Sequence, residues 1–274
     1  MRASLVPVAV FALTFPATVT AGMFYNSHDA FLSEHPRETM VQAWLVRVKP
    51  GAKARFYAYD ADRGCPARTD ACKARGYLVS GDIAVAVQTD GAFTYVEFTG
   101  STGKPIAGAI ESRLLERLEP ARPSLQDWVG HWADTDEKDI VVSRTDDPSV
   151  LSFVGQALWG SHDPARIKNG GVNQGQFAAY GKPVGEWGGF VADLDMPAEE
   201  EGRDGEPHLP AIAQQEGLDT DWTRYSPAES DASDDWRCRG RFRLLGPYLL
   251  VYTPLFLCGG MNVTFTGVYR RVRP

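Results

Sequence analysis

Hydrophobic and polar residues alternate along much of the chain with a period of two, the period of a half-buried β-strand. Between Ile83 and Gln88 the larger apolar side chains occupy every second position, Asp90 and Gly91 provide a hairpin turn, and the segment from Phe93 to Phe98 returns. Segments 42–49 and 55–60 show the same strand pattern. The first half of the chain is therefore predicted to be antiparallel β-structure.

The second half of the chain shows the same alternation. Two sets of apolar or small residues each line one face of a strand: Leu151, Phe153, Gly155 and Ala157, and Val263, Phe265, Gly267 and Tyr269. Segment 249–253 supplies a further strand, and helix is expected only in short pieces such as 111–118. Both halves are therefore predicted to be mainly β.

A pair of prolines, Pro120 and Pro123, brackets charged residues after an apolar region, which is typical of a short, semi-rigid linker. We expect one domain over 22–120 and a second over 124–274. Within the second, segment 186–235 holds 15 acidic side chains and 2 basic ones, without clear periodicity. This segment is interpreted as a long acidic insertion.

The first 21 residues have the pattern of a secretory signal peptide. They carry one charge, Arg2, followed by an apolar stretch from Leu5 to Leu13 and small residues that end at Ala21. No later stretch approaches the roughly 18 uncharged apolar residues that span a bilayer. The mature chain is therefore expected to lack a transmembrane segment and to be exported, either to the periplasm or outside the cell.

Export changes the interpretation of the 4 cysteines. In an oxidising compartment an even number of thiols is usually paired, and we expect the bridges Cys65–Cys72 and Cys238–Cys258. Structural zinc is the alternative. The cysteine spacings do not form the close pairs of zinc sites, and no histidine is placed to complete one, so disulfides are favoured.

The segment from about Arg55 to Leu115 contains Gly81-Asp82-Ile83-Ala84-Val85, the turn at Asp90 and a short return strand. In this it resembles bacterial SH3-like domains, which are small five-stranded barrels that often bind cell-wall peptides or glycans. The resemblance implies that aromatic side chains grip a ligand, and the candidates are Tyr57, Tyr59, Phe93 and Tyr95. Ordinary packing inside the barrel is the alternative for each ring.

Segment 127–274 opens on Asp127-Trp128-Val129-Gly130-His131-Trp132 and closes on a strand that ends in Arg270-Arg271. In these two ends it resembles lipocalin-like, or calycin, barrels of exported bacterial proteins. The resemblance implies that the Gly-x-Trp motif seals one barrel end and that an arginine of the last strand stacks on Trp132. The fold class predicted is thus a small SH3-like barrel followed by a larger antiparallel lipocalin-like barrel with a long acidic insertion.

Four arginines alternate along one predicted strand: Arg237, Arg239, Arg241 and Arg243. Alternation places them on one face, while Cys238, Gly240, Phe242 and Leu244 point inward. A solvated outer face is one interpretation. The others are that the acidic insertion folds over the arginines, or that they bind an anionic partner.

Composition and motifs limit the chemistry. A net charge of −7 does not provide the cationic surface that a general nucleic-acid binder needs. The segment Asp134–Asp139 begins like a calcium loop, but Lys138 occupies the fifth position and no glycine follows. The common motifs of nucleophilic, metalloprotease and phosphate-binding sites do not occur in the sequence. We therefore predict no catalytic residues, no metal site and no cofactor.

The sequence favours a non-enzymatic, exported binding protein that acts at the cell envelope. Its partner would be a cell-wall component such as peptidoglycan, or an envelope protein, for example as an inhibitor or immunity protein. A periplasmic carrier of a small ligand inside the barrel and a cell-wall hydrolase are the alternatives.

Overall fold

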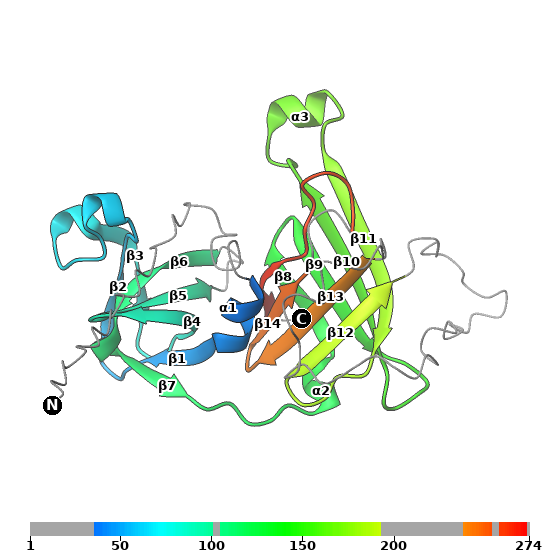
Figure 1. Ribbon diagram of the computed structural model, residues 1–274, viewed down its shortest axis with the longest axis horizontal. Helices are drawn as coiled ribbons and strands as arrows, with labels where there is room; N and C mark the ends of the chain where they lie inside the picture. Colours follow the sequence, from blue (N-terminus) through cyan, green and yellow to red (C-terminus); the bar gives the residue numbers. More distant parts are fainter. Residues whose placement is uncertain (1–35, 101–104, 193–237, 254–257, 273–274) are drawn as a thin grey trace, which may run out of the picture.

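The structure is a computed structural model that describes residues 36–100, 105–192, 238–253 and 258–272. It is mainly β and contains a seven-stranded antiparallel sheet beside an eight-stranded, nearly closed antiparallel barrel (Figure 1). The predicted fold class is confirmed at this level. The predicted signal peptide, Arg237 and nearly all of the predicted acidic insertion lie outside the described residues.

The first sheet has the strand order β3-β2-β6-β5-β4-β1-β7. Its strands are β1 (Trp44–Val48), β2 (Lys53–Tyr57), β3 (Lys73–Val79), β4 (Ile83–Asp90), β5 (Phe93–Thr99), β6 (Pro105–Glu111) and β7 (Leu115–Leu118). The short helices are α1 (Pro36–Gln42), η2 (Ala61–Arg63), η3 (Asp70–Cys72) and η4 (Ser112–Leu114).

Local sequence signals correctly predicted the central hairpin of this sheet but not its edge strand β7. Asp90 of β4 lies opposite Phe93 of β5, which confirms the hairpin and places its turn on Gly91 and Ala92. The helix predicted over 111–118 was wrong: one 3₁₀ turn is followed by β7, whose Leu115 lies opposite Val48 of β1. Pairing with an otherwise open strand satisfies the backbone of this segment better than an isolated helical turn would.

The barrel has the strand order β11-β10-β9-β8-β15-β14-β13-β12. Its strands are β8 (Gly130–Thr135), β9 (Lys138–Arg144), β10 (Leu151–Trp159), β11 (Asn173–Gly181), β12 (Trp187–Ala192), β13 (Cys238–Leu245), β14 (Tyr248–Tyr252) and β15 (Gly267–Arg271). Helix α2 (Leu125–Trp128) precedes β8, and helix α3 (Pro164–Lys168) connects β10 to β11 (Figure 1).

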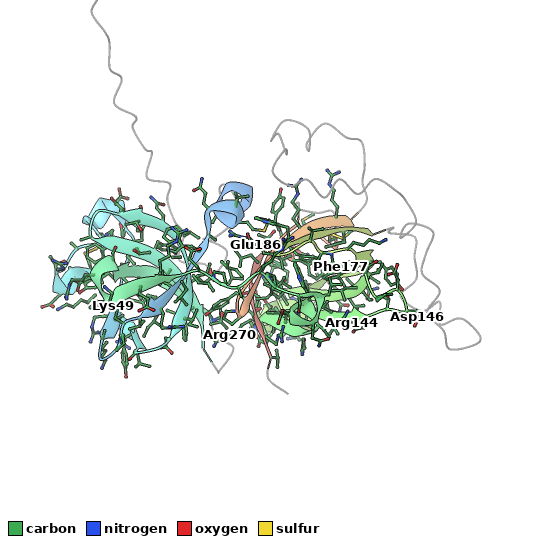
Figure 2. The ribbon with its side chains drawn as sticks, turned by 90° about the horizontal axis from the view of Figure 1, so that it is seen from below. Lys49, Arg144, Asp146, Phe177, Glu186 and Arg270 are labelled. Atoms are coloured by element: carbon green, nitrogen blue, oxygen red, sulfur yellow. A yellow bond between two sulfur atoms is a disulfide. The ribbon has the colours of Figure 1, made fainter. Side chains whose placement is uncertain are left out.

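Aromatic rings fill the barrel interior. The ring of Phe242 lies 4.8 Å from that of Phe153 and 5.2 Å from that of Phe190, and Phe190 stacks on Phe177 at 4.2 Å. Figure 2 shows Phe177 among the side chains of the barrel. Gly155 is needed in this core, since a Cβ there would lie 2.2 Å from the Phe177 ring. The inward face predicted for β10 is thus confirmed.

The predicted Gly-x-Trp end of the barrel is tightly packed. Trp128 and Trp132 are fully buried, and the Trp132 indole N–H donates to the carbonyl oxygen of Trp128 at 2.9 Å. The Arg271 guanidinium lies 4.7 Å from the centre of the Trp132 ring, so the predicted stacking of a C-terminal arginine on this tryptophan is confirmed.

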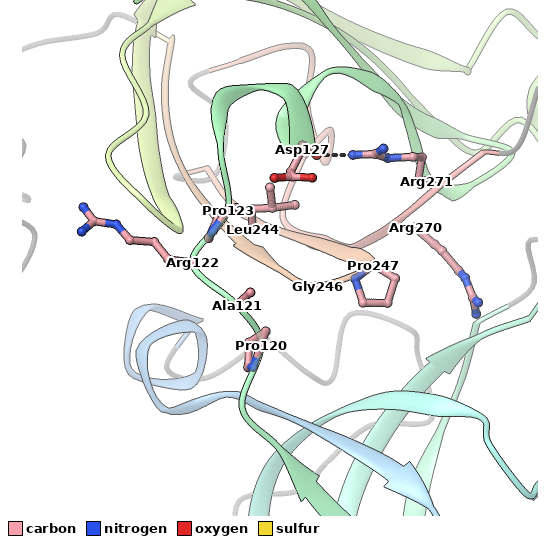
Figure 3. Close-up of a pocket in the computed structure, with 10 residues that line it drawn as sticks. All are labelled: Pro120, Ala121, Arg122, Pro123, Asp127, Leu244, Gly246, Pro247, Arg270 and Arg271. Carbon is pink, nitrogen blue, oxygen red and sulfur yellow. Dashed lines mark hydrogen bonds between the residues drawn. The ribbon is translucent and has the colours of Figure 1, made fainter.

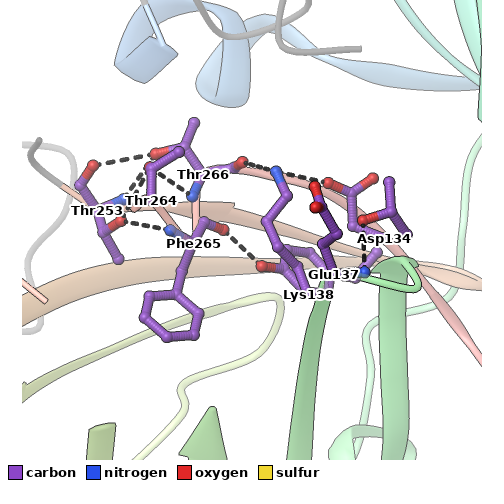
Figure 4. A network of polar contacts seen from close by, with 9 residues as sticks. Asp134, Glu137, Lys138, Thr253, Thr264, Phe265 and Thr266 are labelled. Atoms are coloured by element: carbon purple, nitrogen blue, oxygen red, sulfur yellow. Dashed lines mark hydrogen bonds and ion pairs between the residues drawn. The ribbon is translucent and has the colours of Figure 1, made fainter. Parts of the chain in front are cut away.

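Threonine hydroxyl groups replace part of the strand ladder before β15. Residues predicted as one strand from Val263 onward enter β15 only at Gly267. In the preceding segment the Thr253 hydroxyl accepts from the Phe265 N–H, and the Thr266 hydroxyl donates to the Thr253 carbonyl oxygen (Figure 4). Val263 and Phe265 are buried as expected, although side chains rather than a regular ladder hold them.

Both predicted disulfides are present, Cys65–Cys72 and Cys238–Cys258. The second one anchors a loop that covers the end of β11, where the Gly260 N–H donates to the Gln174 carbonyl oxygen at 3.0 Å.

A buried apolar cluster joins the first sheet to the barrel. Its fully buried members come from α1, β1, β4, β13, β14 and β15 and from the residue before β1: Met40, Ala43, Leu45, Val85, Leu245, Tyr248, Leu250 and Val268. The Tyr248 hydroxyl donates to the Ile83 carbonyl oxygen at 2.6 Å, and Arg270, which lies where the two parts meet in Figure 2, donates to that of Thr99. A packed interface therefore connects the two halves in addition to the proline-bracketed linker.

Candidate functional site

The predicted arginines of β13 differ in their surroundings. Arg239 and Arg241 are half-buried and Arg243 is buried, although strand alternation places all three on one face. The predicted inward positions Cys238, Gly240, Phe242 and Leu244 are all buried, as expected. The structure therefore separates Arg243 from its two neighbours, and a uniformly solvated stripe does not form.

Arg243 holds the end of α1 against the barrel. One nitrogen of its guanidinium, Nη1, donates to the carbonyl oxygens of Met40 at 2.7 Å, Val41 at 3.0 Å and Ala43 at 2.8 Å. The last carbonyl groups of a helix have no partner within it, and a cation there also meets the negative end of the helix dipole. The arginine thus supplies the acceptors at the end of α1 with a donor.

A carboxylate and an aromatic ring complete the surroundings of Arg243. Its Nη2 lies 3.3 Å from Glu186 Oε1, and its guanidinium lies 4.9 Å from the centre of the Trp187 ring. Burial lowers the pKa of Arg243, while the Glu186 carboxylate acts in the opposite direction. These contacts make Arg243 a structural connector between the two parts.

The predicted aromatic candidates pack around the first disulfide. Tyr57 and Phe93 meet edge to face at 5.1 Å, and Tyr59 and Tyr95 meet in the same way at 5.6 Å. Tyr57, Phe93 and Tyr95 are buried, and Tyr59 is half-buried. Burial raises the pKa of the Tyr95 hydroxyl, with a smaller contribution from Glu97. Three of the four rings therefore contribute mainly to packing in this structure.

Glu111 ties the disulfide loop to the sheet. Its Oε2 accepts from Arg68 Nε at 2.8 Å and from Arg113 Nε at 2.9 Å, and its Oε1 lies 3.4 Å from the Tyr57 hydroxyl. Burial by itself raises the pKa of the Glu111 carboxyl, but hydrogen bonds and charge from both arginines outweigh this effect and lower it. The carboxylate is therefore stabilised in its ionised form.

A pocket of about 460 Å³ lies where the linker passes the β13–β14 hairpin (Figure 3). We call it the junction pocket, and its lining residues are Pro120, Ala121, Arg122, Pro123, Asp127, Leu244, Gly246, Pro247, Arg270 and Arg271. More of its lining surface is apolar than polar. The apolar part comes from the linker and the hairpin, and three arginines stand around it.

Existing contacts constrain most charged groups of the junction pocket. Asp127 Oδ2 accepts from the N–H of Ser124 at 2.8 Å and from its hydroxyl at 2.7 Å, which lowers the pKa of Asp127. Arg271 donates to the Asp127 carbonyl oxygen, and Arg270 to that of Thr99. Within the part of the chain that the structure describes, exposed Arg122 forms no hydrogen bond or ion pair.

Sequence reasoning identified parts of the junction pocket without joining them. The sequence predicts a linker at Pro120 and Pro123 and the end of a strand at the final arginines. The linker is more than a hundred residues away in sequence from the hairpin and from the final arginines, so only the fold brings them together. The sequence feature that could have indicated this pocket is the combination of a proline-rich linker with an arginine pair at the end of the last strand.

No metal centre emerges from the described ranges, which hold no group of three or more metal-ligating side chains. Lys138 Nζ lies 2.9 Å from Asp134 Oδ2 and donates to the Thr266 carbonyl oxygen at 3.0 Å (Figure 4). This arrangement holds the end of β9 against the segment before β15. No helix in the same ranges is both long and apolar enough to cross a membrane.

Comparison of the chain with protein-family models, with curated proteins and with solved structures finds no match.

Proposed function

We propose that the protein is an exported, non-enzymatic binding protein that acts at the cell envelope. The partner we propose is a cell-wall component or an envelope protein, for example a wall-degrading enzyme that it inhibits. We also propose that residues 1–21 are a signal peptide and that the mature protein is periplasmic or secreted. Two disulfides are typical of proteins in oxidising compartments and support this placement.

We further propose that the first sheet, within 22–120, is an SH3-like domain and that 124–274 is a lipocalin-like domain. The closed antiparallel architecture of the barrel supports the second assignment. For the first sheet the support is the central hairpin, while the seven strands exceed the five of the common SH3-like barrel.

The junction pocket is the observation that most supports a binding function. Ligand sites are often concave, mostly apolar and located at interfaces between structural units, and volumes of roughly 300–1,000 Å³ are typical. The junction pocket has about 460 Å³ and lies beside the interface of the sheet and the barrel. The aromatic rings that fill the barrel favour binding outside it over transport of a ligand within it.

Affinity capture from envelope extract tests this proposal. The mature protein, the pocket-filling variant Ala121→Phe and the double variant Arg239→Glu/Arg241→Glu are immobilised and compared with a matched control, Arg75→Gln. Arg75 is exposed on β3, far along the chain from the pocket. We expect a component that the mature protein and the control retain and that Ala121→Phe loses.

The double variant tests separately whether Arg239 and Arg241 bind a partner, because these two residues of β13 are not among those that line the junction pocket. Loss of the captured component only in that variant would move the site from the junction pocket to β13. If the mature protein recovers nothing above an unrelated immobilised protein, the proposed envelope function is refuted.

A further inference from the structure

We infer that the junction pocket binds a small amphiphilic anion, a compound with an apolar body and one carboxylate, phosphate or sulfonate group. This inference rests on the proposed function, because it names the ligand chemistry of the same pocket. It follows from three properties of the lining residues: a rigid apolar wall, an excess of positive charge, and one arginine available at the rim.

The apolar wall of the junction pocket is preformed. Pro120 and Pro123 flank Ala121 in the linker, and Pro247 follows Gly246 in the hairpin turn. Proline rings fix the backbone dihedral φ, so little conformational entropy remains to be lost when a ligand enters. Leu244 also lines the pocket but is almost completely buried in the barrel core, so it backs the wall more than it offers surface. These side chains offer no donor or acceptor, and they therefore suit an apolar body.

Positive charge in the junction pocket exceeds negative charge. Among the described residues, three arginines and one carboxylate, that of Asp127, line it. Arg270 and Arg271 donate to carbonyl oxygens, which are neutral, so these contacts orient the guanidinium groups without cancelling their charge. The Asp127 carboxylate is already engaged by Ser124. An anion would therefore be favoured over a neutral or cationic ligand of the same shape.

Arg122 is the residue that we expect to meet the anionic group. Its side chain is exposed and lies beside Gly185, and it forms no hydrogen bond or ion pair with other described residues. Figure 3 shows the side chains of Arg122 and Arg270 extending to opposite sides, away from Ala121 and Pro247, so their positive charge is separated from the apolar wall. A guanidinium group binds carboxylate and phosphate through two parallel hydrogen bonds. An amphiphilic anion fits both parts of this arrangement.

A pair of fluorescent dyes separates the two parts of the inference. The probe is 1-anilinonaphthalene-8-sulfonate, and the control ligand is N-phenyl-1-naphthylamine, which has the same aromatic body without the sulfonate. Both are titrated into the mature protein, with excitation of the dye itself. We expect saturable binding of the sulfonate at one site, about tenfold tighter than binding of the neutral dye.

Variants assign the bound dye to the junction pocket. Ala121→Phe should abolish sulfonate binding by filling the pocket, and Arg122→Gln should weaken it about three- to tenfold. Arg75→Gln, an equally exposed arginine without a partner among the described residues, should leave it unchanged. Circular dichroism and thermal unfolding establish that each variant is folded. Undiminished binding by folded Ala121→Phe would refute the pocket, and equal binding of the two dyes would refute its preference for an anion.

The dye titration is independent of envelope material, so its outcome is distinguishable from that of the capture experiment. Specific dye binding without a captured envelope component would uphold the ligand chemistry and refute the envelope function. Capture without specific dye binding would refute the ligand chemistry alone.

Discussion

Replacing Arg243 by methionine should separate α1 from the barrel. Methionine retains much of the length and volume of the arginine stem but supplies no donor. Three carbonyl oxygens at the end of α1 would lose their partner, and Glu186 would lose its cation. The variant therefore tests whether one guanidinium group fastens the helix to the rest of the molecule.

The expected cost follows from the burial of Arg243. Its side chain is 11% exposed, against 32% for Glu186. Removing one partner from a buried charged contact usually costs about 3–5 kcal/mol. Glu186 can recover part of its hydration, and methionine avoids the cost of burying a charge, so we expect a loss of about 3 kcal/mol. This corresponds to a decrease in Tm of about 6–12 °C.

Urea unfolding measured by circular dichroism gives the change in free energy, and hydrogen exchange of the α1 amides locates it. Arg144→Met is the matched control, because Arg144 is exposed on β9 and makes one surface hydrogen bond, to Gln126. That control should change the free energy of unfolding by less than about 0.5 kcal/mol. A similarly small change in Arg243→Met, with unaltered exchange in α1, would refute the assigned role of Arg243.

Three further perturbations test other parts of the structure. Tyr248→Phe should cost about 1 kcal/mol at neutral pH, because the hydroxyl loses its acceptor. Since burial raises the pKa of Tyr248 to about 12, its contribution should be complete below about pH 10 and disappear as the pH rises toward 12. Urea unfolding from pH 8 to 12 should therefore show a flatter alkaline decline in the variant, and equal declines would contradict this. Glu111→Gln should reduce acid sensitivity, because a lowered pKa contributes stability that is present above about pH 4.3 and lost as the pH falls through the folded-state pKa. Matching acid-unfolding curves for variant and wild type would count against that role. Cys238→Ser/Cys258→Ser should cost about 3 kcal/mol and accelerate amide exchange in β11, whereas unchanged stability would show that the bridge contributes little.

Predictions from the sequence were most successful where the deciding interactions are local. The hairpin between β4 and β5 follows from alternation and a turn glycine, and the inward face of β10 follows from four alternating positions. The disulfides were predicted from the even number of cysteines together with the expected export of the chain. Local signals failed for segment 111–118, because its conformation depends on pairing with β1, which is distant in sequence.

The candidate site was harder to predict than the fold. Arg239, Arg241 and Arg243 look equivalent in the sequence, but Arg243 is buried against the end of α1, whereas Arg239 and Arg241 are half-buried. Tyr57 and Phe93 are packing residues because they share a buried cluster with Cys65 and Cys72 of the first disulfide. In each case the role of a side chain depends on which distant segment covers it.

The sequence by itself determined a mainly β chain and its cysteine pairing, because alternation and turn residues act between neighbours and four cysteines allow few pairings. The packing of Trp132 at the barrel end was implied by a family resemblance. Only the tertiary structure decided that the two parts share a buried apolar cluster, that Arg243 fastens α1, and that a proline linker and a strand end form the junction pocket. Burial and charge compensation depend on contacts between residues far apart in sequence, and the fold sets those contacts.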